Sequence, residues 1–80
     1  TRQEAAVLLL RTAELLGAES GQLGAPPEDE DQIEPWAREA AQWACAAGLM
    51  ETERGNFRPV EGMTRREGEA AVERLAALAG

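Results

Sequence analysis

The chain has 80 residues and a formal charge of −7, with 15 acidic residues against eight basic ones, all of them arginine. A single cysteine and no histidine exclude an internal disulfide and a Cys/His zinc site. The acidic balance argues against non-specific nucleic-acid binding, and no apolar run approaches the ~20 residues of a membrane span. A chain this short forms at most one domain, so we expect contacts with a partner or a neighbouring unit to stabilise it.

Residues 1–17 are predicted to form the first helix. Thr1 and Glu4 make a capping box at its start, and Gly17 is a typical residue just past a helix end. Val7 and Leu10 widen its apolar surface, so we expect contacts on two sides and self-association as a dimer or trimer at high concentration. The residues expected to form its main apolar stripe are Ala5, Leu8, Leu9, Leu15 and Leu16, with Thr12 among them.

Residues 18–33 are predicted to be an acidic connection rich in Gly and Pro. An EF-hand calcium loop needs an oxygen ligand at its fifth position and Gly at its sixth. A loop that started at Asp29 would have Ile33 and Glu34 there, so the pattern fails. We interpret the acidic run at 28–31 as a solvated turn that favours the positive end of the next helix.

Residues 34–47 are predicted to form the second helix, with Pro35 at its first position and Gly48 after its end. Trp36 and Trp43 share a stripe with several alanines, which permit close helix packing. Cys45 lies between alanines and is interpreted as a small buried hydrophobe. Beyond the helix, Leu49 and Met50 are expected to enter the core.

Residues 51–62 are predicted to be a long ordered loop, and residues 64–79 the third helix. Phe57 should anchor the loop and be buried together with both tryptophans, while Pro59 shapes the exit from the loop. Thr64 and Glu67 repeat the capping box. Inside the third helix, Gly68 suggests close contact with another backbone. Its apolar face is expected to comprise Ala71, Val72, Leu75 and Leu78.

The first and third helices share a sequence repeat. Residues 1–15 and 64–78 match without a gap at a constant offset of 63. A repeat of this kind is typical of helical arrays, in which one unit cannot bury its own apolar face. The six matches are Thr1/Thr64, Arg2/Arg65, Glu4/Glu67, Arg11/Arg74, Ala13/Ala76 and Leu15/Leu78.

The residues available for catalysis are few. The chain has no His, Lys or Tyr, its only serine is Ser20, and no Gly-rich phosphate loop occurs. No feature of the sequence distinguishes one pair of carboxylates as a general acid and base. An enzyme that uses surface carboxylates stays open as a distant alternative. We therefore expect no enzymatic activity, no cofactor and no metal.

Four motifs in order resemble the S-layer homology (SLH) family: a Trp-Ala helix start, a Gly-Leu turn, a Gly-x-Phe-x-Pro loop and a Thr-Arg-x-Glu helix start. The family also has a Phe-x-Asp lead-in, and here Pro27 stands in place of its aromatic residue. The resemblance makes residues 34–79 one repeat and residues 1–17 the closing helix of a preceding one. The residues that carry it are Trp36, Gly48, Phe57, Pro59, Thr64 and Glu67.

The resemblance implies an all-α, three-helix unit with one long ordered loop. It also implies a non-catalytic module that anchors a larger exported protein to secondary cell-wall polymer, often pyruvylated, at the bacterial cell surface. Such repeats usually come in threes around a pseudo-threefold axis. Arg2 and Arg65, with the adjacent Arg66, are then the candidate residues for binding an anionic sugar, because an Arg beside free helix N–H groups suits an anion.

An alternative is a structural or assembly module that packs against other repeats or protein partners and binds no glycan. Because the chain begins on a helix cap and not on Met, we also expect it to be a piece of a longer protein.

Overall fold

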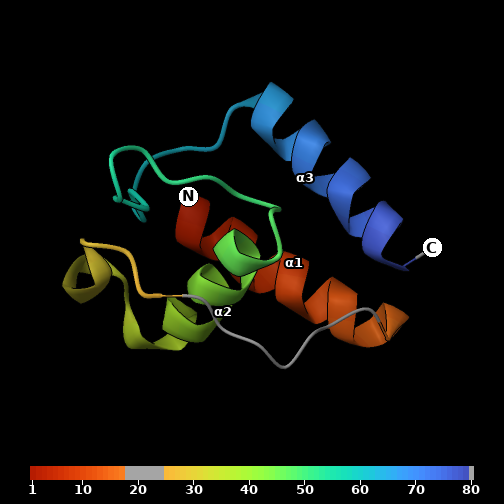
Figure 1. Ribbon diagram of the computed structural model, residues 1–80, viewed down its shortest axis with the longest axis horizontal. Coiled ribbons are helices and arrows are strands. Elements are labelled where there is room, and N and C mark those ends of the chain that lie inside the picture. Colours follow the sequence, from red (N-terminus) through yellow and green to blue (C-terminus); the bar gives the residue numbers. More distant parts are fainter. Residues whose placement is uncertain (18–24, 80) are drawn as a thin grey trace.

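The computed structural model describes residues 1–17 and 25–79, and within them the chain is all-α. Its elements are α1 (Arg2–Leu16), a short 3-10 turn η1 (Glu30–Gln32), α2 (Pro35–Ala46) and α3 (Arg65–Ala79) (Figure 1). The three predicted helices and the long loop before α3 are confirmed. Residues 18–24 of the predicted connection lie outside the described part. No helix in the described part is both long and apolar enough to cross a membrane.

The predicted ends of α1 are confirmed. The Thr1 hydroxyl accepts the N–H of Glu4 at 3.3 Å, and Glu4 reaches back to Thr1 to complete the capping box. Gly17 follows the helix with φ of 70°, in the left-handed region that glycine adopts without strain. Its N–H bonds to carbonyl groups of the last turn, so the helix ends there.

The core lies where α1 crosses α2, and small residues bring the two helices together. Ala6 and Ala13 of α1 are fully buried, as are Ala37 and Ala44 of α2. The predicted stripe on α1 is largely wrong, because only Leu9 of its leucines is buried and the buried positions of α1 are 2, 3, 6, 9 and 13. The remaining leucines of that stripe are exposed, at 64% for Leu8, 89% for Leu15 and 55% for Leu16.

The aromatic core is smaller than predicted. Phe57 and Trp43 are buried, as expected, and so are Leu49 and Met50 just after α2. Trp36 is 58% exposed, so its predicted burial is wrong. It lies in the first turn of α2, and a helical stripe defines a direction around the helix but not how far neighbouring segments extend along its axis.

The loop at residues 51–62 is held by Asp29 from the connection. Its two carboxylate oxygens accept the N–H groups of Phe57 and Arg58, each at 2.8 Å. Asp29 is only 7% exposed, so the acidic run is not the wholly solvated turn that the sequence suggested. The loop turns tightly at Arg54 and Gly55, which have φ of 53° and 83°. The bonds from Asp29 fix the backbone on either side of the Phe57 ring.

α3 runs beside α1 in the same direction (Figure 1). Its predicted capping box is present: Glu67 N–H donates to the Thr64 hydroxyl at 3.1 Å, and Thr64 N–H donates to the Glu67 carboxylate at 3.0 Å. Ala71 and Leu75 are buried, but Val72 and Leu78 of the predicted face are 62% and 47% exposed. The suggested close backbone contact at Gly68 is wrong within the described part of the chain, because a Cβ there would meet none of its atoms within 4 Å.

Candidate anion-binding groove

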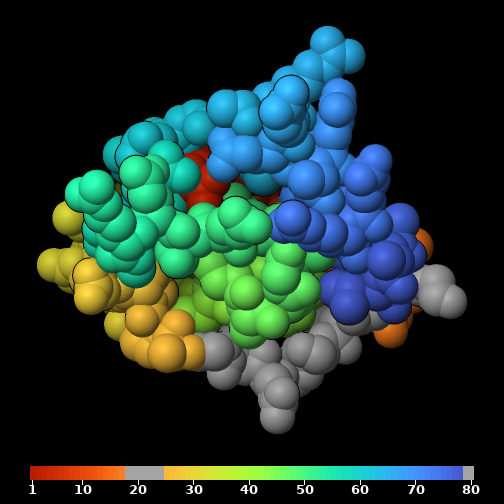
Figure 2. All heavy atoms as spheres, turned by 45° about the horizontal axis from the view of Figure 1, so that its top comes forward, coloured from red at the N-terminus to blue at the C-terminus, as the bar shows by residue number. Residues whose placement is uncertain are grey.

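Arg2 occupies a socket formed by the loop and the start of α3. Its Nε donates to the Phe57 carbonyl at 2.7 Å, Nη2 to the Glu51 carbonyl at 2.6 Å and Nη1 to the Glu67 carboxylate at 2.7 Å. The guanidinium also lies 5.1 Å from the centre of the Phe57 ring. The residue is 1% exposed, and Figure 2 shows the start of the chain almost covered by the loop and α3.

The first turn of α1 therefore offers no anion site. Arg2 N–H donates to the Glu61 carbonyl at 2.8 Å, and Gln3 N–H donates to the Pro59 carbonyl at 3.0 Å. The loop thus uses the N–H groups that would otherwise attract an anion. The expectation that Arg2 contacts a ligand at the surface is corrected: its charge is buried, and each of its three guanidinium nitrogens donates a hydrogen bond within the fold.

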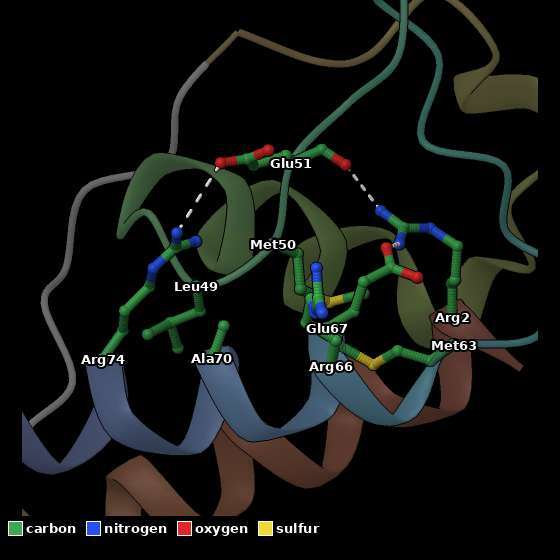
Figure 3. A pocket seen from close by; sticks show the side chains of 9 residues that line it. All are labelled: Arg2, Leu49, Met50, Glu51, Met63, Arg66, Glu67, Ala70 and Arg74. Carbon is green, nitrogen blue, oxygen red and sulfur yellow. Dashed lines mark hydrogen bonds and ion pairs between the residues drawn. The ribbon is translucent and has the colours of Figure 1, made fainter.

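Beside this socket lies a groove of about 260 Å3 between α3 and the turn after α2 (Figure 3). We call it the arginine groove. Its apolar lining consists of Leu49, Met50, Met63 and Ala70. Its charged lining consists of Arg2, Glu51, Arg66, Glu67 and Arg74.

The charges of the arginine groove do not cancel. Arg2 is paired with Glu67, and Arg74 is 3.7 Å from a Glu51 carboxylate oxygen while donating to the Gly48 carbonyl at 3.0 Å. Arg66 forms no ion pair with any of the residues that the structure describes. Two carboxylates against three guanidinium groups leave one positive charge, so the groove is locally basic in an acidic chain.

The structure brings two of the three candidate ligand-binding arginines to one groove. Arg66 and the buried Arg2 both line the arginine groove, whereas Arg65 borders a shallow surface on α3 instead. The Arg65 side chain is 93% exposed and pairs only with Glu69, at 3.1 Å, among the described residues. Of the three, Arg66 and Arg65 remain accessible to a ligand.

Two titratable groups near the groove are shifted. The N–H and the hydroxyl of Thr64, with a smaller contribution from Arg2, lower the pKa of Glu67. Glu67 therefore stays ionised at neutral pH and is poorly suited to act as a general acid. Burial raises the pKa of the half-buried Cys45 thiol, so it stays neutral, as expected of a small hydrophobe.

Sequence reasoning missed Arg74 and Glu51 of the groove, and also Asp29, which holds the loop. For Arg74 a signal exists, since it is the repeat partner of Arg11 and lies two turns beyond Arg66 on α3. For Asp29 the signal is its position two residues after Pro27, where the Phe-x-Asp lead-in of the family that the sequence resembles has its acidic residue. Glu51 contributes a backbone carbonyl as well as its carboxylate, and no sequence pattern predicts that.

The lining of the arginine groove supports binding by ion pairs, hydrogen bonds and apolar contact. Guanidinium groups match carboxylate geometry, and the Met and Leu side chains offer an apolar surface next to them. Among the described residues, no hydroxyl, thiol or imidazole lines it.

No protein-family model matches the chain, and neither a curated protein nor a solved structure matches it.

Proposed function

We propose that the chain is a non-catalytic, SLH-like module of the bacterial cell surface that helps to attach a larger exported protein to an anionic secondary cell-wall polymer. The order of its sequence motifs supports the family, and the all-α repeat-like fold is compatible with it. The arginine groove supports the ligand class. A carboxylate-bearing sugar, such as a pyruvylated one, matches both its charge and its chemistry.

The observation that carries this proposal is the position of Arg66. It lines the groove without an ion-pair partner in the described chain, and Arg74 lines the same groove from further along α3. Arg74 is held by one hydrogen bond to the Gly48 carbonyl and by an exposed carboxylate at 3.7 Å, and both contacts are solvent-accessible, so it can turn to a ligand at modest cost. Two guanidinium groups on one wall can bind one carboxylate between them.

Arg2 has a positioning role in this proposal. Its bond to Glu67 occupies one carboxylate of the groove, and its bond to the Glu51 carbonyl fixes the opposite wall. The sugar ring would lie against Met50 and Met63, which line the groove between the charged groups. Arg65 lies on another side of α3 and is the arginine that the family resemblance favours. Comparing variants of Arg65 and Arg66 therefore shows whether the ligand binds where the resemblance or where the groove places it.

The experiment is a co-sedimentation assay with purified, pyruvylated cell-wall polymer. Arg66→Ala is expected to weaken binding by at least roughly tenfold, the effect of losing one charge-assisted contact. Arg74→Ala should weaken binding less, and Arg11→Ala, an exposed arginine on α1, should leave it unchanged. If Arg66→Ala binds the polymer as tightly as the wild type and Arg65→Ala does not bind it, the ligand site is the one at Arg65 that the resemblance favours, and not the arginine groove.

A second candidate is an assembly module that packs against other repeats and binds no glycan. It is favoured by the apolar surface between α1 and α3, where Leu8 and Val72 are 64% and 62% exposed. Such a module would show no polymer binding by the wild-type chain in the same assay. The two candidates use different surfaces, so variants of each can be tested separately.

A further inference from the structure

A second groove runs between α1 and α3, and its lining is almost entirely apolar. It has a volume of about 310 Å3, and we call it the α1/α3 groove. The two helices run parallel (Figure 1). Each contributes four residues at the same repeat positions, so both present the same face to the groove. The equivalent pairs, at the offset of 63, are Ala5/Gly68, Leu8/Ala71, Leu9/Val72 and Thr12/Leu75.

This groove exposes large apolar side chains. Leu8 and Val72 lie on opposite walls and are 64% and 62% exposed. An apolar surface of this kind, contiguous and rimmed by charge, is typical of an interaction site. The groove also differs from the arginine groove in all but one lining residue, Met63.

The charges that border the α1/α3 groove have opposite order on the two helices. On α1, the exposed residues Glu4 and Arg11 stand one turn before and one turn after Leu8. On α3, Arg65 comes first and Glu73 follows two turns later, along a surface that shares Gly68 and Val72 with the groove. Neither Arg11 nor Glu73 forms an ion pair with another described residue. From the N-terminal to the C-terminal end, the charges thus change from negative to positive along α1 and from positive to negative along α3.

We propose that a second copy of this chain covers the α1/α3 groove in a twofold symmetric dimer, with α1 of each copy parallel to α3 of the other. In that arrangement Glu4 lies near the partner's Arg65, and Arg11 lies near the partner's Glu73. An isologous interface makes each contact twice. The apolar walls then cover one another, and the charges on the rim are complementary.

The antiparallel arrangement would use different ion pairs. With the chains reversed, each α1 would lie against the partner's α1 and each α3 against the partner's α3, so that Glu4 would face the partner's Arg11 and Arg65 the partner's Glu73. The charges on the rim are complementary in either direction, and the charge exchange described below distinguishes the two arrangements. This proposal does not rest on polymer binding, because it uses a different groove.

Sedimentation equilibrium of the 80-residue chain at physiological salt and up to ~100 μM tests the interface, since association depends on concentration. We expect a dimer for the wild type and a monomer for Val72→Glu. The matched control is Val60→Glu in the loop, where the valine is 69% exposed and outside the groove; it should remain dimeric. Circular dichroism verifies that both variants fold. A monomeric wild type, or equal effects of the two variants, would overturn the proposal.

A charge exchange tests the orientation. Arg11→Glu and Glu73→Arg should each weaken dimerisation by roughly tenfold, because each replaces two attractive contacts by two repulsive ones. The double variant R11E/E73R should recover the wild-type dissociation constant if these residues face one another across the interface. Additive weakening in the double variant would exclude the parallel pairing. Both side chains are exposed, so monomer stability should barely change.

Discussion

The guanidinium of Arg2 bonds to the backbone of Phe57 and stacks on its ring at the same time. Nε is 2.7 Å from the Phe57 carbonyl oxygen, and the guanidinium carbon is 5.1 Å from the ring centre, although the residues are 55 positions apart. The first turn of α1 and the anchor of the loop therefore form one structural unit. Because the loop also lines the arginine groove through Glu51, the shape of the groove depends on Arg2.

Arg2 and Arg65 occupy the same repeat position, so their substitution gives a matched comparison. Arg2→Met removes a buried cation and leaves two carbonyls and Glu67 without their partner. We expect it to lower the free energy of unfolding by about 3–5 kcal/mol. Arg65→Met, at a side chain that is 93% exposed, should change it by less than ~0.5 kcal/mol. Urea denaturation measures both, and similar losses for the two variants would contradict the buried role of Arg2.

Asp29 gives the second prediction. Asp29→Asn replaces an oxygen that accepts from Phe57 or Arg58 with an N–H₂ group, which turns a hydrogen bond into a contact between two donors. The expected loss of stability is about 1–3 kcal/mol. Asp31→Asn is the control, since Asp31 belongs to the same acidic run and is exposed. If both variants unfold at the same urea concentration as the wild type, Asp29 does not hold the loop.

The sequence was sufficient to predict the helices and their ends, because these depend on neighbouring residues. The capping boxes at Thr1 and Thr64, and Gly17 after α1, act within four residues of their partners. The burial of Phe57 was also predictable, as the only aromatic residue of the loop. Trp36 was not, because its exposure depends on where other segments end along α2.

The candidate site was harder to predict, because two copies of one motif lie in different surroundings. Arg2 and Arg65 both follow a capping threonine, yet one is 1% exposed and the other 93%. The loop covers the start of α1 and not the start of α3, and a repeat in sequence does not carry that information. Arg66 was among the predicted residues, but its groove partner Arg74 came only from the packing of α3 on the turn after α2.

Gly68 gives a prediction that follows from an unexpected finding. A Cβ at this position of α3 would meet open space, so Gly68→Ala has no steric cost. It should raise the free energy of unfolding by about 1 kcal/mol, because Ala favours the helix over Gly. Gly48→Ala is the contrast: it has equal space but φ of 79°, and it should destabilise by about 1–2 kcal/mol. A loss of stability in Gly68→Ala would mean that another segment approaches α3 closely at this position.

The lowered pKa of Glu67 leads us to expect that the folded chain loses stability in acid. The N–H and hydroxyl of Thr64, and then Arg2, hold the pKa of Glu67 below its ordinary value of 4.5 in the folded chain. A lowered pKa stabilises the folded state above pH 4.5, and this contribution is lost as the pH falls through the lower, folded-state pKa. Glu67→Gln should therefore be less stable at neutral pH and lose less stability between about pH 5 and about pH 3. Thr64→Ala, which keeps the backbone N–H, should give an intermediate slope in thermal denaturation at several pH values.

The proposed attachment to cell-wall polymer depends on the acidic group of the polymer. The most direct measurement is the equilibrium binding of the wild-type chain to one purified, pyruvylated polymer before and after its pyruvate is removed by mild acid. We expect saturable binding to the intact polymer, little binding to the treated one, and loss of the difference in Arg66→Ala. Equal binding to both polymers, or none to either, would contradict it.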